Sequence, residues 1–180
     1  MRLHYALAIC AALMPLAATT AFAQDPAPAA APADVESIDA IVAALYDAIS
    51  GGAGEPRDWD RLRSLFVPGA LLVPAAPRQD GTAPVRALSV EDWIRGAETY
   101  FRDNAFYERE TARELDRFGN VASAMSTYGS YATPDGEPFS RGINAITLIS
   151  DLTRWYVVSI AWDVDREGNR LPEETAAETP

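Results

Sequence analysis

The sequence predicts an α+β domain in which three N-terminal helices pack inside a curved antiparallel sheet. Apolar residues recur at helical spacing in the first half of the chain, whereas the second half alternates apolar and polar residues over long stretches. Short segments rich in Gly, Pro, Asp and Asn, which favour turns, separate these stretches. The pattern covers residues 35–172, about the size of one ordinary domain.

Three segments have helical patterns. The first runs over residues 35–49, where apolar residues form a helical stripe that Gly51 and Gly52 end. The second covers residues 58–66. The third follows a Ser89 cap with an acidic first turn and continues to about residue 104.

A short strand over residues 70–73 follows the second helix, and a loop rich in Pro and Gly follows that strand. Four longer strands are then predicted after the third helix, at residues 105–117, 121–132, 139–149 and 154–163. Each pair of neighbours is joined by a short turn-forming segment. Helices first and a meander last indicate a sheet that wraps the helices.

The two ends of the chain predict export and flexibility. A basic start, the apolar stretch 6–22 and small residues at 21 and 23 predict a signal peptide, 1–23, cleaved after Ala23. Residues 24–34 form a Pro/Ala-rich linker, and residues 173–180 an acidic, disordered tail. We therefore expect a periplasmic or secreted protein.

Cleavage would remove His4 and Cys10, the single histidine and the single cysteine of the chain. All fifteen basic residues are arginines, so lysine chemistry is excluded as well. Proton transfer is left to carboxylates and tyrosines, and neither a metal nor a cofactor is expected. The formal net charge of −11 argues against nucleic acid as a partner, and we expect no membrane span after the signal peptide.

Six motifs carry a resemblance to a known superfamily. They lie at residues 58–66, 89–92, 106–110, 126–128, 141–144 and 154–163. In this order the chain resembles the nuclear transport factor 2-like, or SnoaL-like, superfamily, in a bacterial branch whose members are uncharacterised. The resemblance implies a cone-shaped fold with an apolar pocket at its open end, and often a homodimer formed through the outer sheet face.

Some enzymes of this superfamily, the steroid isomerases and polyketide cyclases, place a catalytic carboxylate or histidine in the pocket. Alignment to the isomerase pattern puts the position of the general base at Pro74, that of the helical tyrosine near Leu45, and that of the second acid at Asn144. Isomerase machinery of that kind is therefore not expected.

Strand alternation, combined with this alignment, predicts which side chains line the pocket. The predicted ligand-binding residues are Ser123, Met125, Thr127, Asn144, Ile146, Ile160 and Trp162. The alternative is that these side chains fill an ordinary core.

Charges alternate along residues 107–114, which favours ion pairs on a solvated strand face. If Glu108 or Glu110 instead faces inward, it is the best candidate acid or base, and burial would raise its pKa. The outer sheet face, with Tyr128, Thr147, Trp155 and Val157, looks apolar enough to form a homodimer.

Three functions stay open at this point. The first is a domain that binds a small apolar or amphipathic molecule. The second is an isomerase, dehydratase or cyclase that uses a carboxylate and tyrosines, and the third is a protein-interaction module. An open cone that holds an ionisable group would favour the enzyme, an open apolar cone would favour binding, and a filled cone would favour the interaction module.

Overall fold

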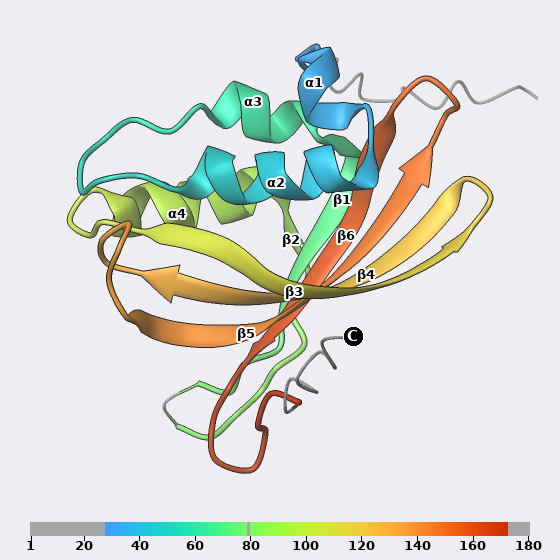
Figure 1. The fold of residues 1–180 in the computed structure, drawn as a ribbon. Coiled ribbons are helices and arrows are strands. Elements are labelled where there is room, and N and C mark those ends of the chain that lie inside the picture. The colour runs from blue at the N-terminus through green and yellow to red at the C-terminus, as the bar shows by residue number, and fades with distance from the viewer. Residues whose placement is uncertain (1–27, 79, 173–180) are drawn as a thin grey trace, which may run out of the picture.

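The computed structural model describes residues 28–78 and 80–172, where four helices cover one face of a curved six-stranded sheet (Figure 1). The predicted signal peptide and acidic tail lie outside these residues. In chain order the elements are α1 (Pro32–Val35), α2 (Ile38–Ile49), α3 (Trp59–Ser64), β1 (Phe66–Pro74), β2 (Leu88–Ser89), α4 (Val90–Phe101), β3 (Tyr107–Phe118), β4 (Val121–Tyr131), β5 (Pro138–Ser150) and β6 (Trp155–Val164).

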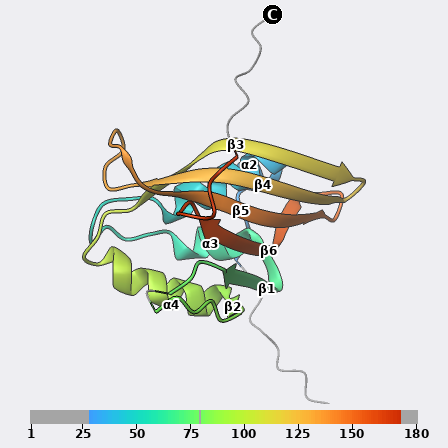
Figure 2. The same ribbon diagram turned by 90° about the horizontal axis from the view of Figure 1, so that it is seen from below.

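The strands form one sheet in the order β2-β1-β6-β5-β4-β3, visible from below in Figure 2. Strand β1 runs parallel to β6, and every other neighbouring pair is antiparallel. The predicted α+β class and the four-stranded meander are confirmed, with strand ends within two residues of the expected ones. In the described part of the chain no helix is long and apolar enough to cross a membrane.

Side-chain caps begin the three longer helices. Ser37 accepts a hydrogen bond from the amide of Ala40 at 3.0 Å, and Ser89 caps α4 in the same way. Asp58 caps α3. Because the Ser37 cap starts a new helix, the single helix predicted over residues 35–49 is in fact two, α1 and α2.

The domain also begins earlier than the sequence indicated. Helix α1 starts at Pro32, inside the predicted linker of residues 24–34. Asp34 forms a two-pronged ion pair with Arg61 of α3, at 2.8 and 2.9 Å, and this pairing lowers the pKa of Asp34. The pair fixes α1 to the helical layer, so the last residues of the expected linker belong to the domain.

Strand β6 contains a bulge that changes which side chains face the core. Thr147 pairs with Ser159, but the next residue, Leu148, pairs with Val157, so β6 has one extra residue at this point. The extra residue resets the alternation. Trp155 and Val157 are therefore buried in the core, and the prediction that they lie on the outer face is wrong.

A buried arginine holds the segment that joins α2 to α3. The guanidinium of Arg57 donates to four backbone carbonyls, those of Ile49, Gly51, Gly52 and Glu55, at 2.7 to 3.2 Å. A side chain at Gly51 would collide with this guanidinium, since its Cβ would lie 2.5 Å from Arg57 Nη1.

We expect Arg57→Lys to lower the free energy of unfolding by about 2 kcal/mol. The compact ammonium of lysine cannot donate to all four carbonyls that the broad guanidinium reaches. Urea unfolding measures the loss. The matched control is Arg95→Lys, whose side chain is 71% exposed, and it should change stability by less than about 0.5 kcal/mol. Equal effects in the two variants would contradict the role given to Arg57.

Candidate functional site: a pocket with a buried carboxyl

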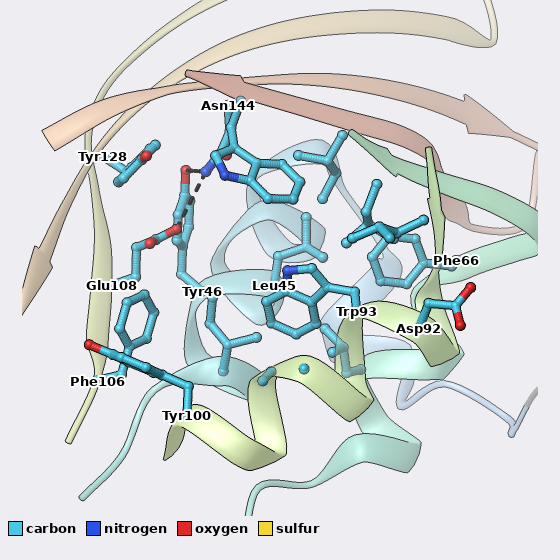
Figure 3. Close-up of a pocket in the computed structure, with 18 of the residues that line it drawn as sticks. Leu45, Tyr46, Phe66, Asp92, Trp93, Tyr100, Phe106, Glu108, Tyr128 and Asn144 are labelled. Atoms are coloured by element: carbon cyan, nitrogen blue, oxygen red, sulfur yellow. Dashed lines mark hydrogen bonds between the residues drawn. The ribbon is translucent and has the colours of Figure 1, made fainter. Parts of the chain in front are cut away.

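A cavity of about 460 Å³ opens between the concave face of the sheet and the helices (Figure 3). Leu45 of α2 and Trp93 of α4 form its helical wall, and Ile146 and Ile160 form part of its sheet wall. Phe106, just before β3, lies beside Glu108. A cavity of this size suits a small molecule of one or two rings.

Aromatic packing shapes the part of the wall near α4. Phe101 stacks on Phe106 with ring centroids 5.1 Å apart, and Trp59 packs between Phe101 and Trp93. These contacts explain why Trp93 and Phe106 hold their positions beside the cavity.

One end of the cavity is polar. Glu108 of β3, Tyr46 of α2, Tyr128 of β4 and Asn144 of β5 meet there, as Figure 3 shows. One helix and three neighbouring strands of the sheet thus contribute one side chain each. The curvature of the sheet brings them together.

Glu108 is the carboxyl group of this end, and it is largely withdrawn from solvent. One carboxylate oxygen accepts a hydrogen bond from Ser130 Oγ at 3.0 Å, and the other accepts one from Asn144 Nδ2 at 3.4 Å. Burial disfavours the charged form more than these two bonds favour it, and it raises the pKa of Glu108 to about 7. A carboxyl with this pKa can both accept and release a proton near neutral pH.

A second set of hydrogen bonds lies behind the pocket. Tyr46 Oη is 2.6 Å from Ser126 Oγ, and Ser126 donates to Glu110 at 2.5 Å. Glu110 forms a two-pronged ion pair with Arg113. Asn144 Nδ2 also donates to Tyr46 Oη at 3.1 Å, so it links this set to Glu108. Burial raises the pKa of Tyr46 to about 12, which keeps the phenol protonated.

Charged side chains also lie at the far rim of the cavity. Asp92 lies across from Glu108 in Figure 3, and Arg86 lines the same region. Asp92 accepts hydrogen bonds from Ser89 and Arg95, and the bond from Ser89 in particular lowers its pKa. Across residues 28–78 and 80–172 no three His, Cys, Asp or Glu side chains are grouped closely enough to hold a metal ion.

The structure divides the predicted ligand-binding residues into two groups. Asn144, Ile146, Ile160 and Trp162 line the cavity. Ser123, Met125 and Thr127 do not. The inward side chains of β4 are instead Ala122, Ala124, Ser126 and Tyr128, all of them buried.

The assignment of Ser123, Met125 and Thr127 to the pocket is therefore wrong by one residue. Alternation sets the spacing of inward side chains but not which face is inward, and the alignment supplied the wrong face. Met125 is 42% exposed on the outer side of the sheet.

The candidate acids Glu108 and Glu110 both turn inward. Glu110 pairs with Arg113, but both side chains are largely withdrawn from solvent, so the expected row of solvated ion pairs is wrong for these two acids. Tyr46 and Tyr128 were missed. The available signal for Tyr46 was a phenol within the aliphatic stripe of a helix, where its hydroxyl needs a polar partner.

The basis of the predicted homodimer also changes. Of the residues expected on the outer face, Tyr128, Trp155 and Val157 are buried on the inner side, and only Thr147 faces outward. Exposed apolar side chains on the outer face include Phe118, Val121, Met125 and Ile149. The homodimer stays a prediction.

No protein-family model matches the sequence, and no curated protein matches it at a significant level. Solved structures do match. A protein of unknown function with a cystatin-like fold from Nostoc punctiforme is 12% identical, over 71% of this chain and 88% of that one, with a TM-score of 0.55. A candidate dehydratase of the nuclear transport factor 2-like family from Streptomyces avermitilis is 15% identical, over 74% and 96%, with a TM-score of 0.54.

This chain has the nuclear transport factor 2-like fold. A protein of unknown function from Mycobacterium tuberculosis is similar as well, at 18% identity over 78% of each chain and a TM-score of 0.54. At such identities the likeness extends to the fold, and the chemistry must come from this chain's own residues.

Within the nuclear transport factor 2-like fold, the positions aligned to the isomerase pattern can now be placed. Pro74 ends β1 beside Trp162, and it offers no acid or base. Leu45 is apolar and lines the pocket, but the next residue, Tyr46, reaches the polar end. The acid at the polar end of this pocket is Glu108, at a position that the isomerase pattern did not indicate.

Proposed function

We propose that this domain takes a small, largely apolar molecule into its pocket, and that Glu108 moves a proton on that molecule. The observation that carries the proposal is a carboxyl with a pKa near 7 at the end of an apolar cavity. Residues 28–172 contain no His, Cys or Lys, so Glu108 is the pocket's one side chain suited to proton transfer near neutral pH among the described residues.

The class of reaction follows from this group. As a carboxylate, Glu108 can accept a proton from a carbon next to a carbonyl. The electron pair of the broken C–H bond then forms a C=C bond, and the carbonyl π pair moves to oxygen. Return of the proton from Glu108 to the same or another carbon completes an exchange or an isomerisation. The similar candidate dehydratase shares only the fold, so the proposal rests on Glu108.

The other two functions fit the cavity less well. A protein-interaction module needs no cavity of about 460 Å³ in its cone, whereas a ligand does. A domain that only binds an apolar molecule gains nothing from a carboxyl that is costly to bury. Binding without reaction remains the second candidate.

We further propose that the protein is exported and acts in the periplasm or outside the cell. The apolar stretch 6–22 and the cleavage site after Ala23 support this proposal. Both lie outside the described residues. Amino-terminal sequencing of the protein from its own host would test it, and a mature chain that begins at Gln24 is the expected result.

The enzyme proposal predicts a specific pH profile. The protein is incubated in D₂O with cyclohexanone, α-tetralone or β-tetralone, and proton NMR measures the loss of the signals from the protons next to the carbonyl. We expect this exchange to depend on the protein. Because the carboxylate is the active form, the rate should rise about tenfold per pH unit below pH 7 and level off above it.

The matched control is Glu114→Gln, which makes the same chemical change on the same strand. Glu114 is exposed and pairs with Met125, away from the pocket. Glu114→Gln should have the same exchange rate and the same pH dependence as the wild-type protein. If all three ketones bind without protein-dependent exchange, the enzyme proposal fails and binding becomes the better assignment.

A further inference from the structure

Hydrogen-bond donors at the polar end of the pocket can be counted one by one. Asn144 has two N–H groups on Nδ2, and they go to Tyr46 Oη and to a carboxylate oxygen of Glu108. The hydroxyl of Ser130 donates to the other carboxylate oxygen of Glu108. Asn144 and Ser130 therefore have no free proton for a ligand.

The proton of Tyr46 is committed as well. Ser126 has a single O–H, and it donates to the Glu110 carboxylate at 2.5 Å. The contact of 2.6 Å between Tyr46 and Ser126 must then use the proton of Tyr46, with Ser126 as acceptor. The oxygen of Tyr46 also accepts a hydrogen bond from Asn144. Tyr46 can therefore donate a hydrogen bond to a ligand only if its bond to Ser126 breaks.

Tyr128 differs from all of these. It lines the cavity, although its side chain is only 4% exposed, and its hydroxyl has no hydrogen-bond partner among the residues that the structure describes. Its phenol end lies over Gly142, where a Cβ would be 2.6 Å from the Tyr128 oxygen. Glycine at this position on β5 leaves room for the phenol.

The neighbours of Tyr128 relate it to Glu108. Tyr128 is two residues from Ser130, which donates to Glu108, and on the facing strand Gly142 is two residues from Asn144, the other donor to Glu108. A free O–H and a carboxyl therefore belong to the same end of one apolar cavity.

We propose that Tyr128 donates a hydrogen bond to an oxygen of the ligand, so that the pocket selects small carbonyl compounds over hydrocarbons of the same shape. This inference rests on the ligand-binding part of the proposed function and names its substrate class. During proton removal by Glu108, the same bond would stabilise the negative charge that develops on the carbonyl oxygen.

The test compares β-tetralone with tetralin, which has the same two rings and no carbonyl. Trp93 and Trp162 line the cavity, so the quenching of tryptophan fluorescence reports binding. Tyr128→Phe should weaken β-tetralone binding about five- to tenfold and leave tetralin binding within about twofold. The ring is kept, so the fold should not change.

Two other variants complete the test. Tyr156→Phe removes a surface hydroxyl bonded to Asp151 and should change neither affinity. Tyr46→Phe should not remove the ketone preference, because the proton of Tyr46 is already donated to Ser126. If Tyr46→Phe rather than Tyr128→Phe removes the ketone preference, or if Tyr128→Phe weakens both compounds equally, the role of Tyr128 is overturned.

The same compounds separate this inference from the enzyme proposal. If β-tetralone binds with a Tyr128-dependent preference but undergoes no exchange, Tyr128 keeps its role and the proposed reaction fails. If neither compound binds to the wild-type protein, the ligand pocket and the role of Tyr128 fail together.

Discussion

Replacing Glu108 with glutamine is expected to slow the protein-dependent exchange of a ketone by at least about 100-fold, because general-base catalysis contributes that much or more. The variant keeps the size of the side chain. The amide introduced by Glu108→Gln can accept from Asn144, and the Ser130 hydroxyl can turn to accept from the new amide N–H. The slower exchange would thus result from the loss of the base and not from a change in the shape of the pocket.

Proton NMR in D₂O measures this effect, with Glu114→Gln as the matched control. Binding of β-tetralone to Glu108→Gln, followed by tryptophan fluorescence, should stay within about threefold of wild type. A variant that binds β-tetralone and still exchanges its protons at the wild-type rate would show that another group is the base.

The same substitution is expected to make the protein more stable at alkaline pH. Burial raises the pKa of Glu108 from 4.5 to about 7, so between these values the folded state binds more protons than the unfolded state. Stability from this group is therefore fully present below about pH 4.5, falls as the pH rises, and is lost above about pH 7. With about 1.4 kcal/mol per tenfold change in proton affinity, the loss is about 3 kcal/mol.

Glutamine does not titrate, so Glu108→Gln should match wild type near pH 4.5 and exceed its stability by about 3 kcal/mol near pH 8. Urea unfolding at several pH values measures the difference between the two proteins, which cancels the contribution of all other groups. Glu114→Gln should show no such trend. A difference between Glu108→Gln and wild type that does not change with pH would mean that Glu108 is not desolvated.

A gain of stability on removal of a side chain is typical of functional sites, where a group is held in an unfavourable environment for its chemistry. Glu108, whose carboxylate is unfavourably desolvated, fits this pattern.

Local signals were enough to predict the layout of the fold. Ser and Asp caps, together with turn residues such as Gly119 and Asn120, mark the ends of helices and strands through short-range bonding. The two-residue strand β2 has no such signal, because so short a strand shows no alternation. The break at Ser37 was hidden by a continuous apolar stripe on both sides of it.

The site was harder to predict, because it depends on which face of each strand is inward. Asn144 and Ile146 of β5 were placed correctly by alternation. For β4, the same alternation fits both faces, and the alignment placed Met125 inward where the structure has Ala122 and Ala124. For β6, the bulge resets the alternation, and no residue in the sequence marks it.

Glu108 illustrates the same limit for charged residues. In a run of alternating charges, an inward carboxyl has the same sequence pattern as a solvated one. Its burial depends on Tyr46, Ser130 and Asn144, which come from three other elements. Contacts of this range cannot be read from a single strand.

The most direct test of this account is the titration of the Glu108 carboxyl itself. Carbon-13 NMR of the protein labelled at the glutamate δ-carbons, with Glu108→Gln used to assign the resonance, follows this group alone. The account predicts a midpoint near pH 7. A midpoint near 4.5, the ordinary value for a solvated glutamate, would contradict it.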